Sequence, residues 1–211
     1  MKRILPGLAA AAAVLALNSF AASAGDTVQD WDQAKAPPPP ALKDVTVKAA
    51  STAFLIADIE AATCNEKDRP RCVADVPGIA AFAKKARDAK MLVAYTNTGR
   101  GSPETILPPV KPMPGEHVVK ATVNKFQNTD LEQYLKDKKI ETIIICGTTA
   151  FGVSLHTATG ATVRGFKVII PVDCNPGSSV YEEQAALFSM VNGPGTAANL
   201  TATRLSMIKI D

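Results

Sequence analysis

The polar residues best placed for chemistry follow apolar runs of the chain. One run, "TIIIC" (142–146), stops at Gly147, and the small-residue turn "GTTAFGV" (147–153) leads into an expected helix. In α/β proteins a catalytic nucleophile often lies at such a turn, but this one holds only threonines and a valine. Further polar residues follow the other runs, and with this turn they are Asp58, Thr96, Asn97, Lys120, Thr148, Thr149, Asp173 and Asn175. If the fold brings them to one edge of a sheet, they are the candidates for a ligand site.

The elements that must position these residues alternate between apolar strands and amphipathic helices. We expect strands at 52–58, 91–96, 118–120, 141–146, 166–173 and about 201–210, and helices at 76–89, 129–139, 152–164 and 179–191. The helix at 76–89 has Ile79, Phe82 and Ala86 on one face and Pro77 in its first turn. This alternation predicts an α/β fold with three α/β/α layers and a mostly parallel, Rossmann-like sheet of about six strands. Ligands of such sheets bind beyond the carboxyl ends of the strands.

The first 24 residues have the pattern of a secretory signal peptide. A basic start, "MKR", precedes the apolar run "ILPGLAAAAAVLAL", and Ala22-Ser23-Ala24 has the small-x-small spacing of a signal-peptidase site. The alternative is an uncleaved membrane anchor, but this run is too short to cross about 30 Å of hydrocarbon comfortably. We therefore expect cleavage after Ala24, a periplasmic or secreted protein, and no membrane association afterwards.

The charge of the mature chain is close to neutral. Removing Lys2 and Arg3 takes two positive charges from the formal +3 and leaves +1. Nucleic-acid-binding proteins carry a clustered basic surface, which this composition does not provide. The sequence therefore argues against a nucleic-acid partner.

Residues 25–50 are expected to form a Pro-rich arm, and residues 51–211 one domain with a sizeable core. Pro37 to Pro40 favour an extended polyproline segment. Trp31 either pins this arm to the domain or to a partner subunit, or belongs to a loose tether. Inside the domain, residues 97–117 form a loop rich in Gly and Pro, and loops of that length are usually functional or mobile.

Export makes disulfides possible for the four cysteines. Cys64 and Cys72 bracket the polar stretch "NEKDRPR", and we expect a bridge that closes this loop, because their spacing fits neither CxxC redox chemistry nor a zinc knuckle. Cys146 and Cys174 each end an expected strand. They are buried thiols or, if those strands are neighbours, a second bridge; we favour buried thiols.

Three segments together resemble the isochorismatase-like hydrolase family, which includes nicotinamidases and other amidases. They are "FLIADIE", "VVKATVNKFQNTDLEQYL" and "IIICGTTAFGVSLHTATGATVRGFKVIIPVDC", in the family's order and spacing between about residues 52 and 190. In that family an Asp, a Lys and a Cys meet at the strand ends. The Asp takes the proton of the nucleophile, the Lys orients or stabilises charge, and the thiolate attacks a carbonyl.

Carried over by position, the resemblance implies that Asp58 is the acid–base residue and Lys120 its lysine. Lys120 stands six residues before Phe126, as in the family pattern, and Lys125 is the runner-up because it adjoins Phe126. An ammonium beside a carboxylate lowers the proton affinity of that carboxylate. Glu60 replaces the usual Gln of the first motif.

The sequence departs from the family at the nucleophile. Six residues after Gly147, where the family has its cysteine, stands Val153, which has no lone pair and no proton to give. Ser154 is adjacent but would point about 100° away on a helix. The thiol mechanism is therefore not expected. Isochorismatases themselves also have a small non-nucleophilic residue there and cleave a vinyl ether with the Asp as proton donor.

The resemblance also bears on the turn, on metals and on assembly. The peptide Thr149-Ala150 matches a bond that is often cis in the family, in a turn that offers backbone N–H groups to an oxyanion. The nicotinamidase branch binds a metal through an Asp and two His after its second strand, but "AYTNTGRGSPE" has no His, so we expect neither metal nor cofactor. The family commonly forms dimers or tetramers, which implies a homo-oligomer.

Two functions follow from these observations. The first is an exported hydrolase that acts on a small molecule through Asp58 and Lys120 without a Cys nucleophile. The second is a catalytically silent binding or scaffold protein in which Val153 fills the former nucleophile position. The retained Asp and Lys favour the enzyme, and the valine favours the silent protein.

Overall fold

The computed structural model describes residues 25–211, so the expected signal peptide and its cleavage site up to Ala24 lie outside the described residues. The chain divides into two units between Pro38 and Pro39, and the structure describes the first of them from residue 25 onward. In the described part of the first unit, Trp31–Gln33 form a short 3-10 helix and Trp31 is exposed. No helix within residues 25–211 is long and apolar enough to cross a membrane.

The second unit begins earlier than the expected domain boundary at residue 51. Strand β1 (Val45–Val47) pairs in parallel with the last strand, β8 (Ile208–Ile210), and the Lys43 N–H donates to the Ala202 carbonyl oxygen at 3.1 Å. These backbone hydrogen bonds join the second half of the predicted arm to the domain. The alternating segment "VTV" is only three residues long, which is why it was not recognised as a strand.

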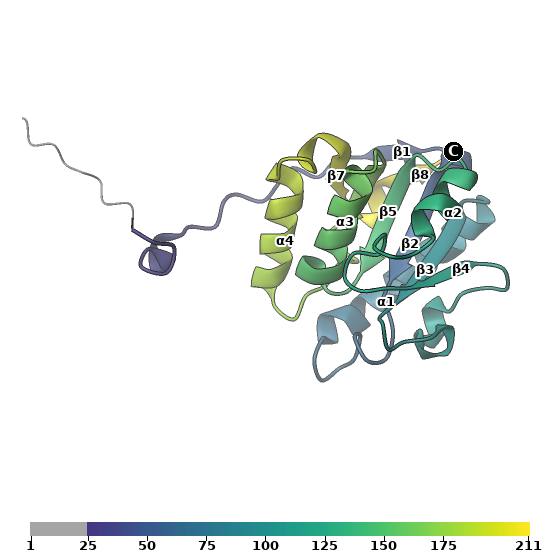
Figure 1. Ribbon diagram of the computed structural model, residues 1–211, viewed down its shortest axis with the longest axis horizontal. Coiled ribbons are helices and arrows are strands. Elements are labelled where there is room, and N and C mark those ends of the chain that lie inside the picture. Colours follow the sequence, from purple (N-terminus) through teal and green to yellow (C-terminus); the bar gives the residue numbers. More distant parts are fainter. Residues whose placement is uncertain (1–24) are drawn as a thin grey trace, which may run out of the picture. The chain divides into compact units, whose positions relative to one another are not determined.

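The six other strands form one parallel sheet, as predicted (Figure 1). They are β2 (Thr52–Ala57), β3 (Leu92–Asn97), β4 (His117–Lys120), β5 (Thr142–Gly147), β6 (Lys167–Pro171) and β7 (Leu200–Thr203). Their spatial order is β4-β3-β2-β5-β6-β7. The expected strand at about 201–210 is wrong as a single element, because a 3-10 turn at Leu205–Met207 separates β7 from β8.

Helices cover both faces of the sheet and make three layers (Figure 1). Helix α1 (Pro70–Asp88) packs with the β1–β8 pair on one face, and α2 (Leu131–Asp137), α3 (Leu155–Thr162) and α4 (Val180–Asn192) pack on the other. Along β2, Phe54 and Ile56 enter the first core, and Ala53 and Leu55 the second. A strand buried on both faces must be apolar at every position, as "TAFLIA" is.

Helix α1 begins six residues before the expected start at residue 76. Pro70 occupies its first turn, and Pro77, expected there, lies inside the helix with its ring exposed. The apolar stripe runs back through Val76 to Cys72, so burial extends the helix past the proline. The expected helix at 152–164 is also modified, because Ala150–Ser154 form a π-helical turn before α3.

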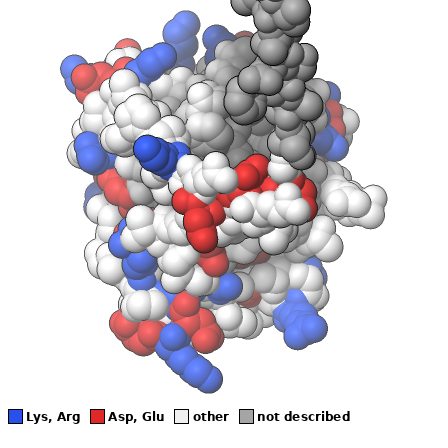
Figure 2. Space-filling model, turned by 90° about the vertical axis from the view of Figure 1, so that its left-hand side faces the viewer, with Lys and Arg blue, Asp and Glu red and all other residues white. Residues whose placement is uncertain are grey.

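The basic side chains on one face of the molecule are dispersed. On the face shown in Figure 2, lysines and arginines lie singly or in small groups between uncharged residues and form no continuous basic surface. This is the distribution that a nearly neutral chain leads us to expect.

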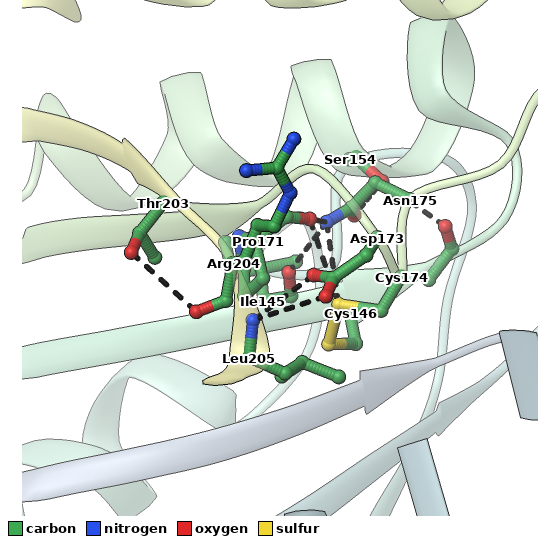
Figure 3. The surroundings of a disulfide bond; sticks show 11 residues. Ile145, Cys146, Ser154, Pro171, Asp173, Cys174, Asn175, Thr203, Arg204 and Leu205 are labelled. Carbon is green, nitrogen blue, oxygen red and sulfur yellow. Dashed lines mark hydrogen bonds between the residues drawn. A yellow bond between two sulfur atoms is a disulfide. The ribbon is translucent and has the colours of Figure 1, made fainter. Parts of the chain in front are cut away.

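The described residues contain two disulfides. Cys64–Cys72 closes the expected loop, with a Cα–Cα distance of 5.3 Å. Cys146–Cys174, with a Cα–Cα distance of 5.0 Å, corrects our preference for buried thiols (Figure 3). Strands β5 and β6 are neighbours, and the Gly147 N–H donates to the Cys174 carbonyl oxygen at 3.0 Å. The end of β5 and the segment that follows β6 therefore lie side by side, and the side chains of Cys146 and Cys174 meet there.

Removal of the second disulfide tests this pairing. Replacing Cys146 and Cys174 together by Ala is expected to lower the free energy of unfolding by about 3.5 kcal/mol, because the unfolded chain loses a loop constraint of this length. Urea denaturation measures the change. Thiol titration of the unfolded, unreduced wild type should find no free cysteine among the four, and two free thiols would contradict the pairing.

Helix α1 also carries a carboxyl group in an unfavourable setting. Burial and then the negative charge of Glu183 raise the pKa of Asp75 from 3.8 to about 6, and the opposing attraction of Arg71 is smaller. Arg71 is instead engaged by Glu183, to which it donates two hydrogen bonds of 2.6 Å. The folded protein therefore holds the Asp75 proton more tightly than the unfolded chain does.

This difference predicts that Asp75→Asn stabilises the protein at neutral but not at acidic pH. A raised folded-state pKa means that the wild type loses stability as pH rises from about 4 through 6. The variant cannot ionise at this position, so its urea midpoint should exceed that of the wild type at about pH 7.5 and match it near pH 3.5. Asp88→Asn, on an exposed carboxylate of the same helix, is the control. An equal effect at both pH values would contradict the prediction.

Candidate active site

The site lies where the order of the strands reverses. From β2 the chain proceeds outward to β3 and β4, and it then crosses back to place β5 on the other side of β2. The crevice beyond the carboxyl ends of such a pair of strands is the usual ligand site of an open parallel sheet. Asp58 follows β2 and the turn 147–153 follows β5, so the topology brings these two predicted segments together.

The Asp58 carboxylate is buried and fully engaged. Asp58 has a φ of 56°, in the left-handed region that Asp tolerates better than most residues, and its side chain is 3% exposed. Thr96 Oγ1 donates to Oδ1 at 2.7 Å, and Lys125 Nζ donates to Oδ2 at 2.6 Å. Thr63 Oγ1 donates to the Asp58 backbone carbonyl oxygen. The carboxylate is therefore fixed in position and orientation by its neighbours.

The lysine of this pair is Lys125, and the expected pairing of Asp58 with Lys120 is wrong. Lys120 is exposed at the end of β4, on the side opposite the buried Val119. Beyond β4 the chain turns back over the strand ends, so Lys125 is 0% exposed and its ammonium group also donates to the Ala121 carbonyl oxygen at 3.4 Å. The spacing to Phe126 selected the wrong lysine because it cannot report this turn.

Burial dominates the electrostatics of the pair. Burial raises the pKa of Asp58 above 3.8 by more than the Lys125 ammonium and the hydrogen bonds from Lys125 and Thr96 lower it. Burial likewise lowers the pKa of Lys125, against the attraction of Asp58. Both shifts favour the neutral forms, so the carboxyl group can hold its proton at a higher pH than an exposed Asp does.

The turn after β5 approaches the strand end very closely. A Cβ atom on Gly147 would lie 2.6 Å from the Ala57 carbonyl oxygen, so a side chain cannot be accommodated there. The cis peptide bond is Thr148-Thr149, one residue before the expected Thr149-Ala150. The Ala150 N–H donates to the Pro176 carbonyl oxygen at 3.0 Å. Contrary to the expectation, it is therefore not free to donate to an oxyanion. The Thr149 N–H has no acceptor within residues 25–211.

These residues surround a pocket of about 300 Å³. Val153 is buried and lines it, together with Asp58 and the threonines of the turn. The complete lining is Asp58, Thr63, Arg69, Thr98, Gly99, Ala121, Thr122, Val123, Thr148, Thr149 and Val153. Sequence patterns do not predict four of these residues, Thr63, Arg69, Thr98 and Thr122, because they lie in loops whose course no periodic pattern reports.

Glu60 fixes the long loop after β3 to the end of β2. Its buried carboxylate accepts hydrogen bonds from Asn97 Nδ2 and the Thr98 N–H, both at 3.0 Å, and from Thr105 Oγ1. Burial raises the pKa of Glu60, but the hydrogen bonds together lower the pKa by a larger amount. The net pKa of Glu60 therefore lies below its usual value. A Cβ atom on Gly101 would overlap this carboxylate. Glu60 is thus a structural anchor beside the pocket.

The remaining predicted residues lie outside the pocket. Asp173 accepts the Leu205 N–H at 3.0 Å, and Asn175 accepts the Ser154 hydroxyl at 2.6 Å, so both support the turns around the second disulfide (Figure 3). His117, which was not a predicted site residue, also lies outside the pocket and stacks on Tyr134, with its Nε2 3.0 Å from an Asp130 oxygen. The described residues hold no group of three or more His, Cys, Asp or Glu that could bind a metal ion.

The sequence model of the isochorismatase domain matches residues 52–203. The chain belongs to the isochorismatase family. This match contains the whole parallel sheet and every residue of the pocket described above.

Known isochorismatase-fold proteins agree with this assignment. N-carbamoylsarcosine amidase from an Arthrobacter species is 40% identical over 63 residues, which is 29% of this chain and only 24% of that protein. An isochorismatase family protein from Desulfovibrio vulgaris has a TM-score of 0.67 at 19% identity, over 74% of this chain and 95% of its own. N-carbamoylsarcosine amidase from Thermoplasma acidophilum has a TM-score of 0.61 at 20% identity, over 74% and 96%. The last two likenesses show the fold.

The corrected pairing makes opposite predictions for two lysines of this isochorismatase-fold site. Lys125→Met leaves the Asp58 carboxylate buried without its cation and should cost about 3 kcal/mol or more of unfolding free energy at neutral pH. Lys120→Met changes an exposed side chain and should change stability by less than about 0.5 kcal/mol. Urea denaturation compares the two. Equal stabilities would contradict the pairing, and Asp58→Asn combined with Lys125→Met should recover part of the loss.

Proposed function

We propose that this isochorismatase-family chain is a small-molecule hydrolase in which Asp58, held by Lys125, transfers the proton and no thiol attacks. The observation that carries the proposal is the buried Asp58–Lys125 pair, with the carboxyl group in the wall of an open pocket. Val153 lines the same pocket, six residues after Gly147, where the family pattern has its nucleophile. The pocket retains about 300 Å³ of space, which favours an enzyme over a silent protein whose site is filled.

The chemistry best suited to a proton donor without a nucleophile is hydrolysis of a vinyl ether. The protonated Asp58 carboxyl group gives its proton to the terminal vinyl carbon, and a C–H bond forms as the double bond becomes an oxygen-stabilised cation. Water adds to that cation and returns one proton to Asp58. The resulting hemiketal breaks its C–O bond to release an alcohol and a carbonyl compound. No step requires a covalent bond to the chain.

The surroundings of Asp58 support this cycle. Once the proton has left, the Lys125 ammonium and the Thr96 hydroxyl stabilise the carboxylate at 2.6 and 2.7 Å. The family resemblance implies a backbone N–H that donates to an oxyanion. The Thr149 N–H has no acceptor within residues 25–211, so we assign it as the donor to a substrate oxygen. Export to an oxidising compartment is part of the proposal and is consistent with the two disulfides. The homo-oligomer remains a prediction.

A substrate panel tests the proposal. Vinyl ethers, esters and amides, including N-carbamoyl amino acids because of the partial similarity to an N-carbamoylsarcosine amidase, are incubated with the wild type and the products are separated chromatographically. Asp58→Asn should abolish turnover while its circular dichroism spectrum stays unchanged, and Lys120→Met should retain activity. Turnover that survives Asp58→Asn would refute the proposed role of Asp58. No turnover of any panel member would favour the silent binding protein.

The pH dependence identifies which form of Asp58 acts. Burial raises the pKa of Asp58, so the protonated donor persists above pH 3.8 and is lost as pH rises through the raised pKa. The value of kcat/KM for a vinyl ether should therefore be highest at acidic pH and fall as pH rises. A kcat/KM that rises with pH over the same range would show that Asp58 acts as a base instead.

A further inference from the structure

Arg69 brings to the pocket a positive charge that the described chain does not neutralise. It lines the cavity, and no carboxylate within residues 25–211 forms an ion pair with it. Its Nη1 donates to the Thr63 carbonyl oxygen at 2.7 Å, but its buried Nε has no acceptor in the described part of the chain. A guanidinium group has five N–H donors, and burying one without an acceptor is unfavourable.

The other groups of the pocket leave this charge uncompensated. Asp58 and Lys125 form a pair with each other, so their charges cancel. Every other lining residue is a threonine, a glycine, an alanine or a valine. Within residues 25–211, Arg69 is therefore the charged lining residue that has no partner of opposite charge, which favours an anionic group of the ligand beside its guanidinium.

Arg69 is held rigidly relative to the reacting carboxyl group. Arg69 lies inside the loop that the Cys64–Cys72 disulfide closes, and its backbone N–H donates to the Asn65 carbonyl oxygen at 2.9 Å. Thr63, which accepts from the guanidinium group, donates its own hydroxyl to the Asp58 carbonyl oxygen. A continuous series of hydrogen bonds thus joins Arg69 to Asp58, as a preorganised binding group requires.

We propose that Arg69 binds a carboxylate of the substrate and thereby selects small monoanions for the Asp58 site. The inference rests on the proposed function and specifies its substrate class. A planar carboxylate matches the fork of a guanidinium group, and its single charge balances that of Arg69. A phosphate monoester carries about 1.5 to 2 negative charges at neutral pH, which one arginine would leave partly unpaired.

Calorimetric binding of three matched pairs tests this selection. Acetate, N-acetylglycine and benzoate are each compared with their neutral primary amide, and methyl phosphate is added as the alternative anion. The wild type should bind at least one acid about tenfold more tightly than its amide. The proposal is overturned if no acid is preferred over its amide, or if methyl phosphate binds more tightly than every acid.

Two variants assign the preference to Arg69. Arg69→Gln should lose the preference for the acid while binding of the amide is unchanged, and Arg69→Lys, which keeps the charge but not the fork, should retain only part of it. Arg71→Gln is the matched control, because Arg71 is two residues away, pairs with Glu183 and does not line the pocket. If Arg71→Gln lowers acid binding as much as Arg69→Gln does, or if both Arg69 variants keep the full preference, Arg69 is not the binding group.

The same measurements separate this inference from the proposed function. Asp58→Asn should retain the preference for acids, since Arg69 is unchanged. A wild type that shows this preference but hydrolyses no substrate would refute the hydrolase and leave the carboxylate site standing. A wild type that hydrolyses a neutral vinyl ether as fast as its carboxylate analogue, with turnover dependent on Asp58 but not on Arg69, would refute the carboxylate site alone.

Discussion

The structure depends on one costly interaction, the ion pair of Asp58 and Lys125 beneath the pocket. Two charged side chains that are 3% and 0% exposed have given up almost all of their hydration, and their mutual attraction offsets this cost only if further hydrogen bonds hold them in place. The Thr96 hydroxyl and the Ala121 carbonyl oxygen supply those bonds. A sheet buried on both faces makes such a site possible, since it excludes water from the strand ends and holds β2 and β3 in fixed register.

Around this pair, each of the two central strands is followed by a segment that a disulfide restrains. After β2 the Cys64–Cys72 bridge closes the loop that carries Arg69, and at the end of β5 the Cys146–Cys174 bridge joins the turn to the segment after β6. Because the Ala150 N–H donates to the Pro176 carbonyl oxygen, the second bridge also fixes the segment that supports the turn beside Val153. The restraints therefore lie at the one edge of the sheet where side-chain positions matter for chemistry.

The sequence predicted the parallel sheet and Asp58, but not the lysine with which Asp58 pairs. A run such as "TAFLIA" is apolar at consecutive positions because both faces of β2 are buried, and the acid after it had to lie at the carboxyl edge. Lys125 was only the runner-up to Lys120 and Arg69 was not assigned, because loops position both residues and loop geometry leaves no period in the sequence. The bridge between Cys146 and Cys174 required knowledge that β5 and β6 are neighbours. Strand β1 was missed because its partner, β8, lies more than 160 residues away in the sequence, where Val45 pairs with Ile208.

Val153 contributes to the apolar surroundings of Asp58 in the proposed hydrolase. A buried ion pair is seldom more stabilising than an apolar replacement of similar volume, so stability alone does not account for the Asp58–Lys125 pair. In the proposed hydrolase the pair serves proton transfer, the pocket beside it is open, and Val153 contributes an apolar wall to that pocket. An apolar neighbour strengthens the desolvation that raises the pKa of Asp58, and so favours a proton donor over an attacking group. In the proposed hydrolase, Val153 and the buried pair thus both favour proton transfer by Asp58.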